Sequence, residues 1–200
     1  RIMSCHIGSG ASITAIRDGK CVATSMGLTP LGGIMMGTRT GDMDPSVFNY
    51  VCKVTGKSAE EVYQIFNKQS GFKGVFGSSS DSRDVIAAME KGDKHAASAY
   101  HLFIRRICDF IGQYYVRLGG CDLIIFSAGI GENDPNTRRD VIREIGPSLG
   151  AKINEELNYK IHGTEALLST EDSKIKVAVI PTDEEVMIVR DAYKEYLKSV

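Results

Sequence analysis

A short apolar run followed by a glycine-containing turn constrains the fold of this chain more than any other feature. The run Leu123–Phe126 has the length and composition of a buried strand, and Gly129–Asn133 (Gly-Ile-Gly-Glu-Asn) comes just before a helix-like segment. Open α/β sheets bind nucleotides at the carboxyl ends of such strands. Glycine allows positive φ and close approach of the backbone to a ligand, and a following helix offers unpaired N–H groups. One such turn is weak evidence, but it predicts an α/β protein.

Hydrophobic periodicity extends this prediction along the chain. Asp18-Gly19 between the strand-like runs Ser12–Ile16 and Cys21–Ser25 is typical of a β-hairpin. Apolar residues at spacings of three and four over Lys94–Leu118 predict a long core helix. Further helices are predicted from Pro45 to about Val54, after the caps Ser58 and Asp81, from about Pro135 to Ile145 and from Glu184 to Leu197, and further strands at the start of the chain, at Leu123–Phe126 and at Lys176–Ile180.

The order of these elements predicts the fold class and the domain organisation. A hairpin followed by strand-turn-helix units indicates an α/β fold, a mixed β-sheet flanked by helices, in a single domain over residues 1–200. The segments Leu28–Asp44 and Gly71–Ser80, and the polar connection after Ile145, are expected to lack helices and strands.

Composition excludes several classes of function. The chain has 200 residues, of which 42% are hydrophobic and 24% charged, and a formal charge of -1 with no long run of like charges. This gives no electrostatic footprint for nucleic acid or for a membrane surface. No stretch approaches the roughly 20 apolar residues of a membrane span, and nothing resembles a signal peptide. Five scattered cysteines without metal-ligand spacing indicate reduced thiols and a cytoplasmic protein. The chain begins inside a strand-like run without an initiator Met, which predicts a longer polypeptide.

A second glycine-containing turn, His6–Gly10 (His-Ile-Gly-Ser-Gly), joins the first two strands. Its backbone N–H groups and its serine can wrap a phosphate. An ordinary glycine-rich hairpin explains the same composition, and the turn alone does not decide between them.

The loop Met36–Pro45 places Arg39 between two glycines and ahead of two carboxylates. An arginine on such a loop can clamp a transferring phosphoryl group by charge and by paired hydrogen bonds. The alternative is an ordinary loop ion pair between Arg39 and Asp42 or Asp44.

Two acidic segments stand at predicted helix starts. Asp81-Ser82-Arg83 can cap a helix or hold the sugar and ring of a nucleotide. Ile180–Glu185 ends a strand with three acids, which either favour the helix N-terminus or hold Mg²⁺ beside a phosphate.

Taken in order, these segments resemble the carboxyl-terminal half of the acetate kinase family, in the superfamily of acetate and sugar kinases, heat-shock chaperone ATPases and actin. The resemblance covers essentially all 200 residues. It implies an actin-like, ribonuclease H-like ATPase lobe. The matching motifs are the phosphate loop at His6–Gly10, the segment Thr24–Leu31, the arginine loop Met36–Pro45, the adenosine-contacting motif Asp81–Arg83, the nucleotide loop Gly129–Asn133 and the segment Ile180–Glu185.

The resemblance implies a role for each motif. Arg39 is expected to stabilise the transition state, and Glu184 to bind Mg²⁺. The residues expected to bind ATP or ADP are His6, Ile7, Gly8, Ser9, Gly10, Asp81, Ser82, Arg83, Gly129, Ile130, Gly131, Glu132 and Asn133. The implied reaction is reversible transfer of the γ-phosphoryl group of ATP to acetate, which gives acetyl phosphate.

Three positions depart from the family pattern, and one whole lobe is missing. Ser9 and Asp183 stand where the family usually has Asn, and Gly32 where it usually has Glu. The amino-terminal lobe, which in the family supplies the acetate pocket and a catalytic Asp and His, does not map onto this chain. We therefore expect these residues to form a nucleotide-binding lobe that is inactive alone and that belongs to a homodimeric enzyme. Tyr114, Tyr115 and neighbouring apolar groups then line either a subunit interface or the core of the chain, and the sequence does not decide between the two.

Two alternatives remain at the level of sequence. A propionate or butyrate kinase shares much of this lobe. A nucleotide-binding or assembly module without transfer activity belongs to a different class of function, and the retention of Arg39 argues against it.

Overall fold

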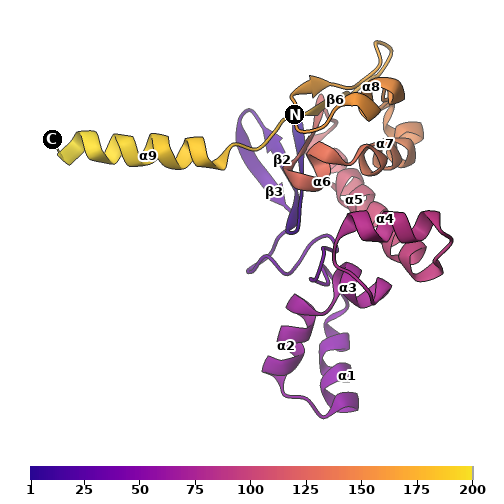
Figure 1. Cartoon of the computed structure of the whole chain (residues 1–200). Coiled ribbons are helices and arrows are strands. Elements are labelled where there is room, and N and C mark those ends of the chain that lie inside the picture. The colour runs from indigo at the N-terminus through magenta and orange to yellow at the C-terminus, as the bar shows by residue number, and fades with distance from the viewer. Residues whose placement is uncertain (200) are drawn as a thin grey trace.

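The computed structural model describes residues 1–199, and one mixed sheet organises them (Figure 1). Val200, the last residue of the predicted domain, lies outside the described residues. Six strands in this range pair in the order β3-β2-β1-β4-β6-β5. The strands are β1 (Ile2–Ile7), β2 (Ala11–Arg17), β3 (Lys20–Thr24), β4 (Leu123–Ser127), β5 (Ala166–Leu167) and β6 (Lys176–Val179). The three consecutive neighbours β1, β4 and β6 are parallel, and β2, β3 and β5 are antiparallel to their neighbours. The α/β fold with a mixed sheet is therefore confirmed.

The predicted hairpin forms at Asp18-Gly19. Both residues have positive φ, 50° and 73°, as a two-residue turn that matches the twist of its strands requires. The strands β2 and β3 that it joins each start one residue earlier than the sequence pattern indicated.

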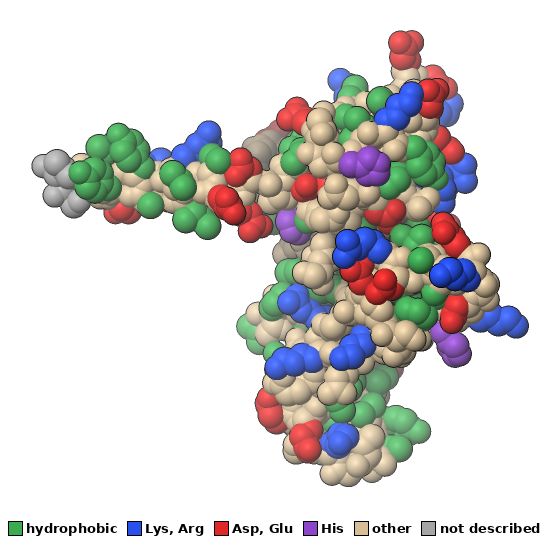
Figure 2. Space-filling model, in the orientation of Figure 1, with side chains coloured by type: hydrophobic (Ala, Val, Ile, Leu, Met, Phe, Trp, Pro, Cys, Tyr) green, Lys and Arg blue, Asp and Glu red, His purple; other side chains and the backbone are tan. Residues whose placement is uncertain are grey.

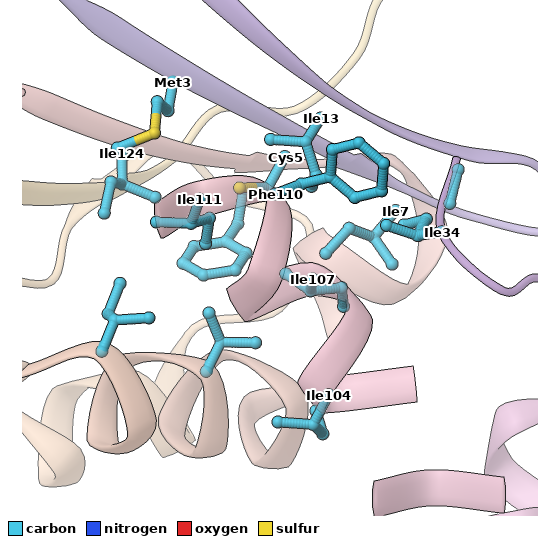
Figure 3. Packing of buried hydrophobic residues seen from close by; sticks show 14 of the residues in the cluster. Met3, Cys5, Ile7, Ile13, Ile34, Ile104, Ile107, Phe110, Ile111 and Ile124 are labelled. Atoms are coloured by element: carbon cyan, nitrogen blue, oxygen red, sulfur yellow. The ribbon is translucent and has the colours of Figure 1, made fainter. Parts of the chain in front are cut away.

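The core lies between the sheet and helix α5 (Lys94–Leu118), whose limits agree with the prediction. Alternate side chains of β1 and β2 are buried, and Figure 3 shows them facing the apolar side of α5. Tyr114 is only 3% exposed and Tyr115 packs against the core, so both contribute to the fold of the single chain. Each large side chain buried here contributes roughly 1.5–3 kcal/mol to folding.

The remaining helices lie beside this core or extend from it (Figure 1). They are α1 (Pro45–Thr55), α2 (Ala59–Lys68), α3 (Gly71–Phe76), α4 (Ser82–Glu90), α6 (Ala128–Asn133), α7 (Pro135–Leu149), α8 (Glu155–Lys160) and α9 (Glu184–Ser199). The predicted capping box between Ser58 and Glu61 is present at the start of α2.

Several predicted boundaries and loops were wrong. Helix α3 occupies the glycine-rich segment expected to be irregular, and α8 and the short β5 occupy the polar connection after Ile145. Helix α7 continues through Pro147 to Leu149 because a proline near the end of a helix removes only one hydrogen bond.

Helix α9 extends away from the body of the molecule (Figure 1). Large apolar side chains remain exposed along it, as Figure 2 shows: Val186, Met187, Ile188, Val189, Tyr193, Tyr196 and Leu197. None of the helices described between residues 1 and 199 combines the length and the apolar character that a membrane span requires.

Candidate functional site

The segments singled out from the sequence meet at one edge of the sheet. Strands β1, β4 and β6 are parallel neighbours, so the residues that follow their carboxyl ends lie side by side. Two cavities open there, one of about 540 Å³ and one of about 440 Å³. The larger cavity is lined by Gly8, Ser9, Gly37, Phe72, Ser80, Asp81, Ser82, Arg83, Gly129, Ile130, Asn133 and Asp134. The smaller cavity is lined by His6, Ala128, Gly129, Glu132, Thr182, Asp183, Glu184 and Glu185.

The turn after β1 packs directly against the segment after β4. A Cβ on Gly8 would lie 3.4 Å from the Cβ of Ala128 and 3.8 Å from the backbone N of Gly129. His6 Nδ1 lies 3.3 Å from the hydroxyl of Ser127, at the end of β4. The side chain of Ile7 is buried in the core, so only its backbone is available to a ligand. The sequence Gly-Ser-Gly therefore forms one wall of the larger cavity with Gly8 and Ser9.

The segment after β4 is itself a helix, α6, and this corrects the expectation of a glycine turn with positive φ. Neither Gly129 nor Gly131 has positive φ, whereas Ala128 has φ 62°. A non-glycine residue in this left-handed region costs about 1–2 kcal/mol. The position is held from outside: Ala128 N donates to Thr182 Oγ1 at 3.2 Å, and Glu132 Oε1 accepts from Thr182 N at 2.9 Å. Backbone strain of this kind is concentrated at functional sites.

Arg39 makes no ion pair among the described residues. Its Nη1 donates to the carbonyl oxygen of Pro30 at 3.2 Å and contacts the sulfur of Met36 at 3.6 Å. A Cβ on Gly10 would lie 3.2 Å from the same nitrogen, so the guanidinium group lies against the turn after β1. The arginine loop and the candidate phosphate loop are therefore in contact.

The two carboxylates that follow Arg39 in the sequence have other partners. Asp42 Oδ1 accepts from the backbone N of Gly33 at 2.7 Å, and its Oδ2 lies 3.9 Å from Arg106. Asp44 caps α1 by accepting from Ser46 N at 2.8 Å. The alternative of a loop ion pair between Arg39 and either carboxylate is not observed.

The arginine loop is fixed by backbone hydrogen bonds to the turn between α2 and α3. Ser70 N donates to the carbonyl of Thr38, and Phe72 N donates to the carbonyl of Met36, both at 2.9 Å. Thr40 N donates to the carbonyl of Phe66 at 3.1 Å. These main-chain hydrogen bonds on both sides of Arg39 fix the position of its backbone, from which the side chain extends.

Asp81 serves as the predicted helix cap and also pairs with Arg83. Its Oδ1 accepts from Arg83 N at 2.9 Å, and its Oδ2 lies 2.6 Å from Arg83 Nη2. These hydrogen bonds lower the pKa of Asp81. Both residues line the larger cavity together with Ser82, while the Arg83 side chain is 88% exposed. The cap interpretation is confirmed, and the pair is also placed where a ligand in this cavity can reach it.

The acids after β6 differ in how many partners they have. Asp183 Oδ1 accepts from Val186 N at 3.1 Å, a contact that an Asn at this position also allows. Glu184 and Glu185 make no hydrogen bond or ion pair within residues 1–199, and both line the smaller cavity. No three potential metal-ligating side chains cluster in this described part of the chain. Mg²⁺ nevertheless fits here, because it commonly uses one or two carboxylates and completes its shell with water and phosphate oxygens.

Some residues at this edge carried no signal in the sequence. Phe72 lies in a segment rich in glycine and serine, and Thr182 was noted only as part of a motif. Arg138 is completely buried, although its position after Pro135 in an otherwise polar helix is typical of a solvent-exposed residue. Only packing between segments distant in sequence could have identified them.

Comparison with known proteins agrees with this geometry. The Acetokinase family model matches residues 1–190. The acetate kinase of Clostridium novyi is 47% identical over 191 residues, which are 96% of this chain and 47% of the relative. The crystal structure of Porphyromonas gingivalis acetate kinase is 40% identical with a TM-score of 0.92, covering 97% of this chain and 48% of that one. A propionate kinase from Francisella tularensis is also 40% identical, with a TM-score of 0.87, covering 94% of this chain and 47% of that one.

The match therefore extends over nearly the whole chain, and the chain spans about half the length of the curated relatives it matches. The mixed sheet with its surrounding helices is the fold of this half of the solved acetate kinases. On the strength of the family model and these relatives, the chain belongs to the acetokinase family.

Proposed function

We propose that this chain is the carboxyl-terminal, nucleotide-binding lobe of an acetate kinase, a phosphotransferase that moves the γ-phosphoryl group of ATP to acetate and back. The observation that carries the proposal is that residues of His6–Gly10, Asp81–Arg83, Gly129–Asn133 and Ile180–Glu185 line two adjoining cavities. Arg39 lies beside the first of these turns and has no carboxylate partner among the described residues. On the family resemblance, the proposal includes Mg²⁺, a cytoplasmic location and a homodimer.

The two cavities suit the two parts of a nucleotide. The larger cavity has apolar walls at Phe72 and Ile130 and a charged rim at Asp81 and Arg83, which suits a base and a ribose. The smaller cavity has backbone at Gly129 and two free carboxylates, which suits phosphates with a divalent cation. Gly129 lines both cavities, so a single extended ligand can occupy the two.

Phosphoryl transfer requires mainly alignment and neutralisation of charge. Arg39, held against Gly10, supplies a fixed positive charge and paired donors for the transferring group. Ser9 and the backbone of the His6–Gly10 turn orient the phosphates. Glu184 would hold Mg²⁺, which when bound neutralises charge on the phosphate oxygens.

The rest of the reaction requires a second lobe. Relatives are about twice as long as this chain, and helix α9 leaves a row of apolar side chains exposed, including Ile188 and Tyr193. An exposed apolar row on a projecting helix favours a protein partner. We propose that this partner is the amino-terminal lobe of the same polypeptide, that it brings the acetate pocket, and that the isolated chain does not transfer phosphate.

Two other functions predict different behaviour. The chain is also similar to a propionate kinase, so we assign the preference for the length of the acyl substrate to the other lobe. Competition between acetate and propionate in a two-lobed protein measures that preference. A binding or assembly module has no use for an arginine that lies at a phosphate turn without a carboxylate partner among residues 1–199, and the position of Arg39 therefore favours the kinase.

The metal site gives the first test of the proposal. The variant Glu184→Gln keeps the size of the side chain and removes its charge, so we expect the affinity for MgADP to fall about tenfold. Affinity for ADP in excess EDTA should stay within about twofold, because no metal is then present to lose. Calorimetric titration of the chain measures both values.

The neighbouring carboxylate gives a matched control. Glu185 lines the same cavity and is equally without a partner in the described residues. The family resemblance assigns the metal to Glu184 alone, so we expect Glu185→Gln to change MgADP affinity less than about threefold, well below the tenfold loss that corresponds to about 1.4 kcal/mol. Equal losses in both variants, with and without metal, would contradict a metal role for Glu184 and indicate a general effect on the start of α9.

A further inference from the structure

The largest completely buried side chain among the described residues is a charged one, Arg138 of helix α7. It is 0% exposed, and no carboxylate of residues 1–199 accepts a hydrogen bond from it. Asp134, four residues earlier, is bonded to Asn136 N and Thr137 Oγ1 instead. Burial of a charged group without a bonded counter-ion is expensive, and a neutral apolar side chain would fill the same space at lower cost. The residue therefore calls for an explanation beyond filling the core.

All the donors of this guanidinium group are used, and every acceptor is an uncharged oxygen. Nη1 donates to the carbonyls of Gly131 and Glu132 at 2.9 and 2.8 Å. Nη2 donates to the carbonyls of Asn158 and Ile161, both at 2.9 Å. Nε donates to Asn158 Oδ1 at 2.7 Å. One side chain thus connects α6 to α8 and to Ile161, the residue that follows α8.

The charge persists at neutral pH in spite of burial. Desolvation lowers the pKa of Arg138 to about 10, and the negative charge of Asp134 opposes this shift. The group is therefore protonated at pH 7, and all five N–H donors are present. A lysine at this position would offer three donors without the planar geometry that reaches two segments at once.

The two carbonyls that Arg138 binds belong to the family's nucleotide motif. Helix α6 has only six residues, so its last carbonyls have no partner within the helix. Thr182 also holds α6, by its bonds to Ala128 N and to the side chain of Glu132. Between these two attachments lie Gly129 and Ile130, which face the cavities. The segment is thus bonded at Ala128, Gly131 and Glu132, and the residues between the first two of these line the cavities.

We propose that Arg138 is a positioning residue for nucleotide binding, which fixes the backbone of residues 128–133 against the two cavities by binding the carbonyls of Gly131 and Glu132. Asn158 is its support: Asn158 Oδ1 accepts from Arg138, and its Nδ2 donates to the carbonyl of Pro135 at 2.9 Å, which locks the orientation of the amide. The inference rests on the proposed function, because it assigns these cavities to a nucleotide.

The test compares Arg138→Lys with Ile145→Ala in the full chain. Ile145 is a buried apolar residue of the same helix, so its truncation removes core packing and leaves the bonds to the carbonyls of α6 in place. We expect Arg138→Lys to weaken MgADP binding by about tenfold or more, because lysine cannot reproduce the paired bonds to the carbonyls of Gly131 and Glu132 and the backbone that lines the cavities is then no longer fixed. We expect Ile145→Ala to lower the melting temperature and to keep MgADP affinity within twofold, when both are measured by calorimetry well below the melting temperatures.

A second readout is independent of nucleotide. In ¹H–¹⁵N NMR spectra without ligand, the amide resonances of Gly129 and Gly131 should shift in Arg138→Lys and keep their positions in Ile145→Ala. Unchanged glycine resonances together with unchanged MgADP affinity would overturn the inference. So would parallel losses of affinity in Arg138→Lys and Ile145→Ala, which would reduce Arg138 to a stabilising residue.

Asn158→Ala decides the matter if Arg138→Lys does not fold. This variant removes one acceptor of the guanidinium group and keeps its bonds to α6, so we expect a smaller loss of MgADP affinity, about threefold, and the inference fails if the affinity is unchanged. Failure of the proposed function has a different signature: the unmodified chain then does not bind MgADP at all, and the inference falls with it.

Discussion

Replacement of Arg39 by alanine is expected to lower phosphoryl transfer by at least about a thousandfold in a protein that joins this chain to an acetate kinase amino-terminal half, the effect typical of an arginine that stabilises a phosphoryl transition state. The affinity of the chain for MgADP should change less than about threefold. The reason is geometric: Arg39 lies against Gly10 rather than among the residues that line the larger cavity. Its charge matters most when the γ-phosphoryl group is in transit, and ADP lacks that group.

Arg143→Ala is the matched control. Arg143 is an exposed arginine of α7 in an ion pair with Glu155, and its loss should leave turnover within about twofold, because exposed ion pairs contribute little. Steady-state rates of acetyl phosphate formation and MgADP titrations of the same preparations separate the outcomes. If Arg39→Ala lost binding and turnover in equal measure, the residue would be part of the ground-state site; if it kept its turnover, the kinase proposal would lose its main support.

Gly71→Ala is expected to destabilise the chain by about 3 kcal/mol. Gly71 has φ 62°, where an alanine costs about 1–2 kcal/mol. An added Cβ would overlap the carbonyl oxygen of Met36 and lie 2.9 Å from that of Arg39, and such overpacking costs typically 1–3 kcal/mol more. Because the displaced carbonyls are those of Met36 and of Arg39, the proposed catalytic residue, turnover of a two-lobed protein should also fall.

Gly112→Ala gives the contrasting result. Gly112 lies inside α5 and a Cβ there would meet nothing within 4 Å, so alanine should stabilise the chain by about 0.5–1 kcal/mol through helix propensity. Urea unfolding of both variants measures the difference. A Gly71→Ala chain as stable as the unmodified one would show that the arginine loop is not fixed by the turn between α2 and α3.

Local patterns predicted the parts of the fold in which local and tertiary preferences agree. The limits of α5 were predicted from its apolar spacing, and the structure places caps at the same limits, Asp93 before the helix and Gly119 after it. The hairpin at Asp18-Gly19 is set by turn chemistry alone. Helix α3 escaped prediction because a segment rich in glycine is a poor helix former, and its burial under α5 through Phe72 overrides that preference.

The site was predictable as a set of motifs but not as a set of contacts. Periodicity and motif order placed the turns at the carboxyl ends of β1 and β4, which topology then brings together. Arg39 has no carboxylate partner among the described residues because Asp42 accepts from Gly33 N and Asp44 from Ser46 N. The positive φ of Ala128 depends on Thr182, which is distant in sequence. Such long-range hydrogen bonds leave no periodic signal.

Calorimetric titration of this chain with MgADP tests the central claim, that it is a folded nucleotide-binding lobe, most directly. We predict saturable binding at one site per chain, competitive with MgATP and weakened by Glu184→Gln. If circular dichroism shows a folded chain and the titration with MgADP gives no heat of binding, the claim is contradicted, because the two cavities then do not form a nucleotide site on this lobe.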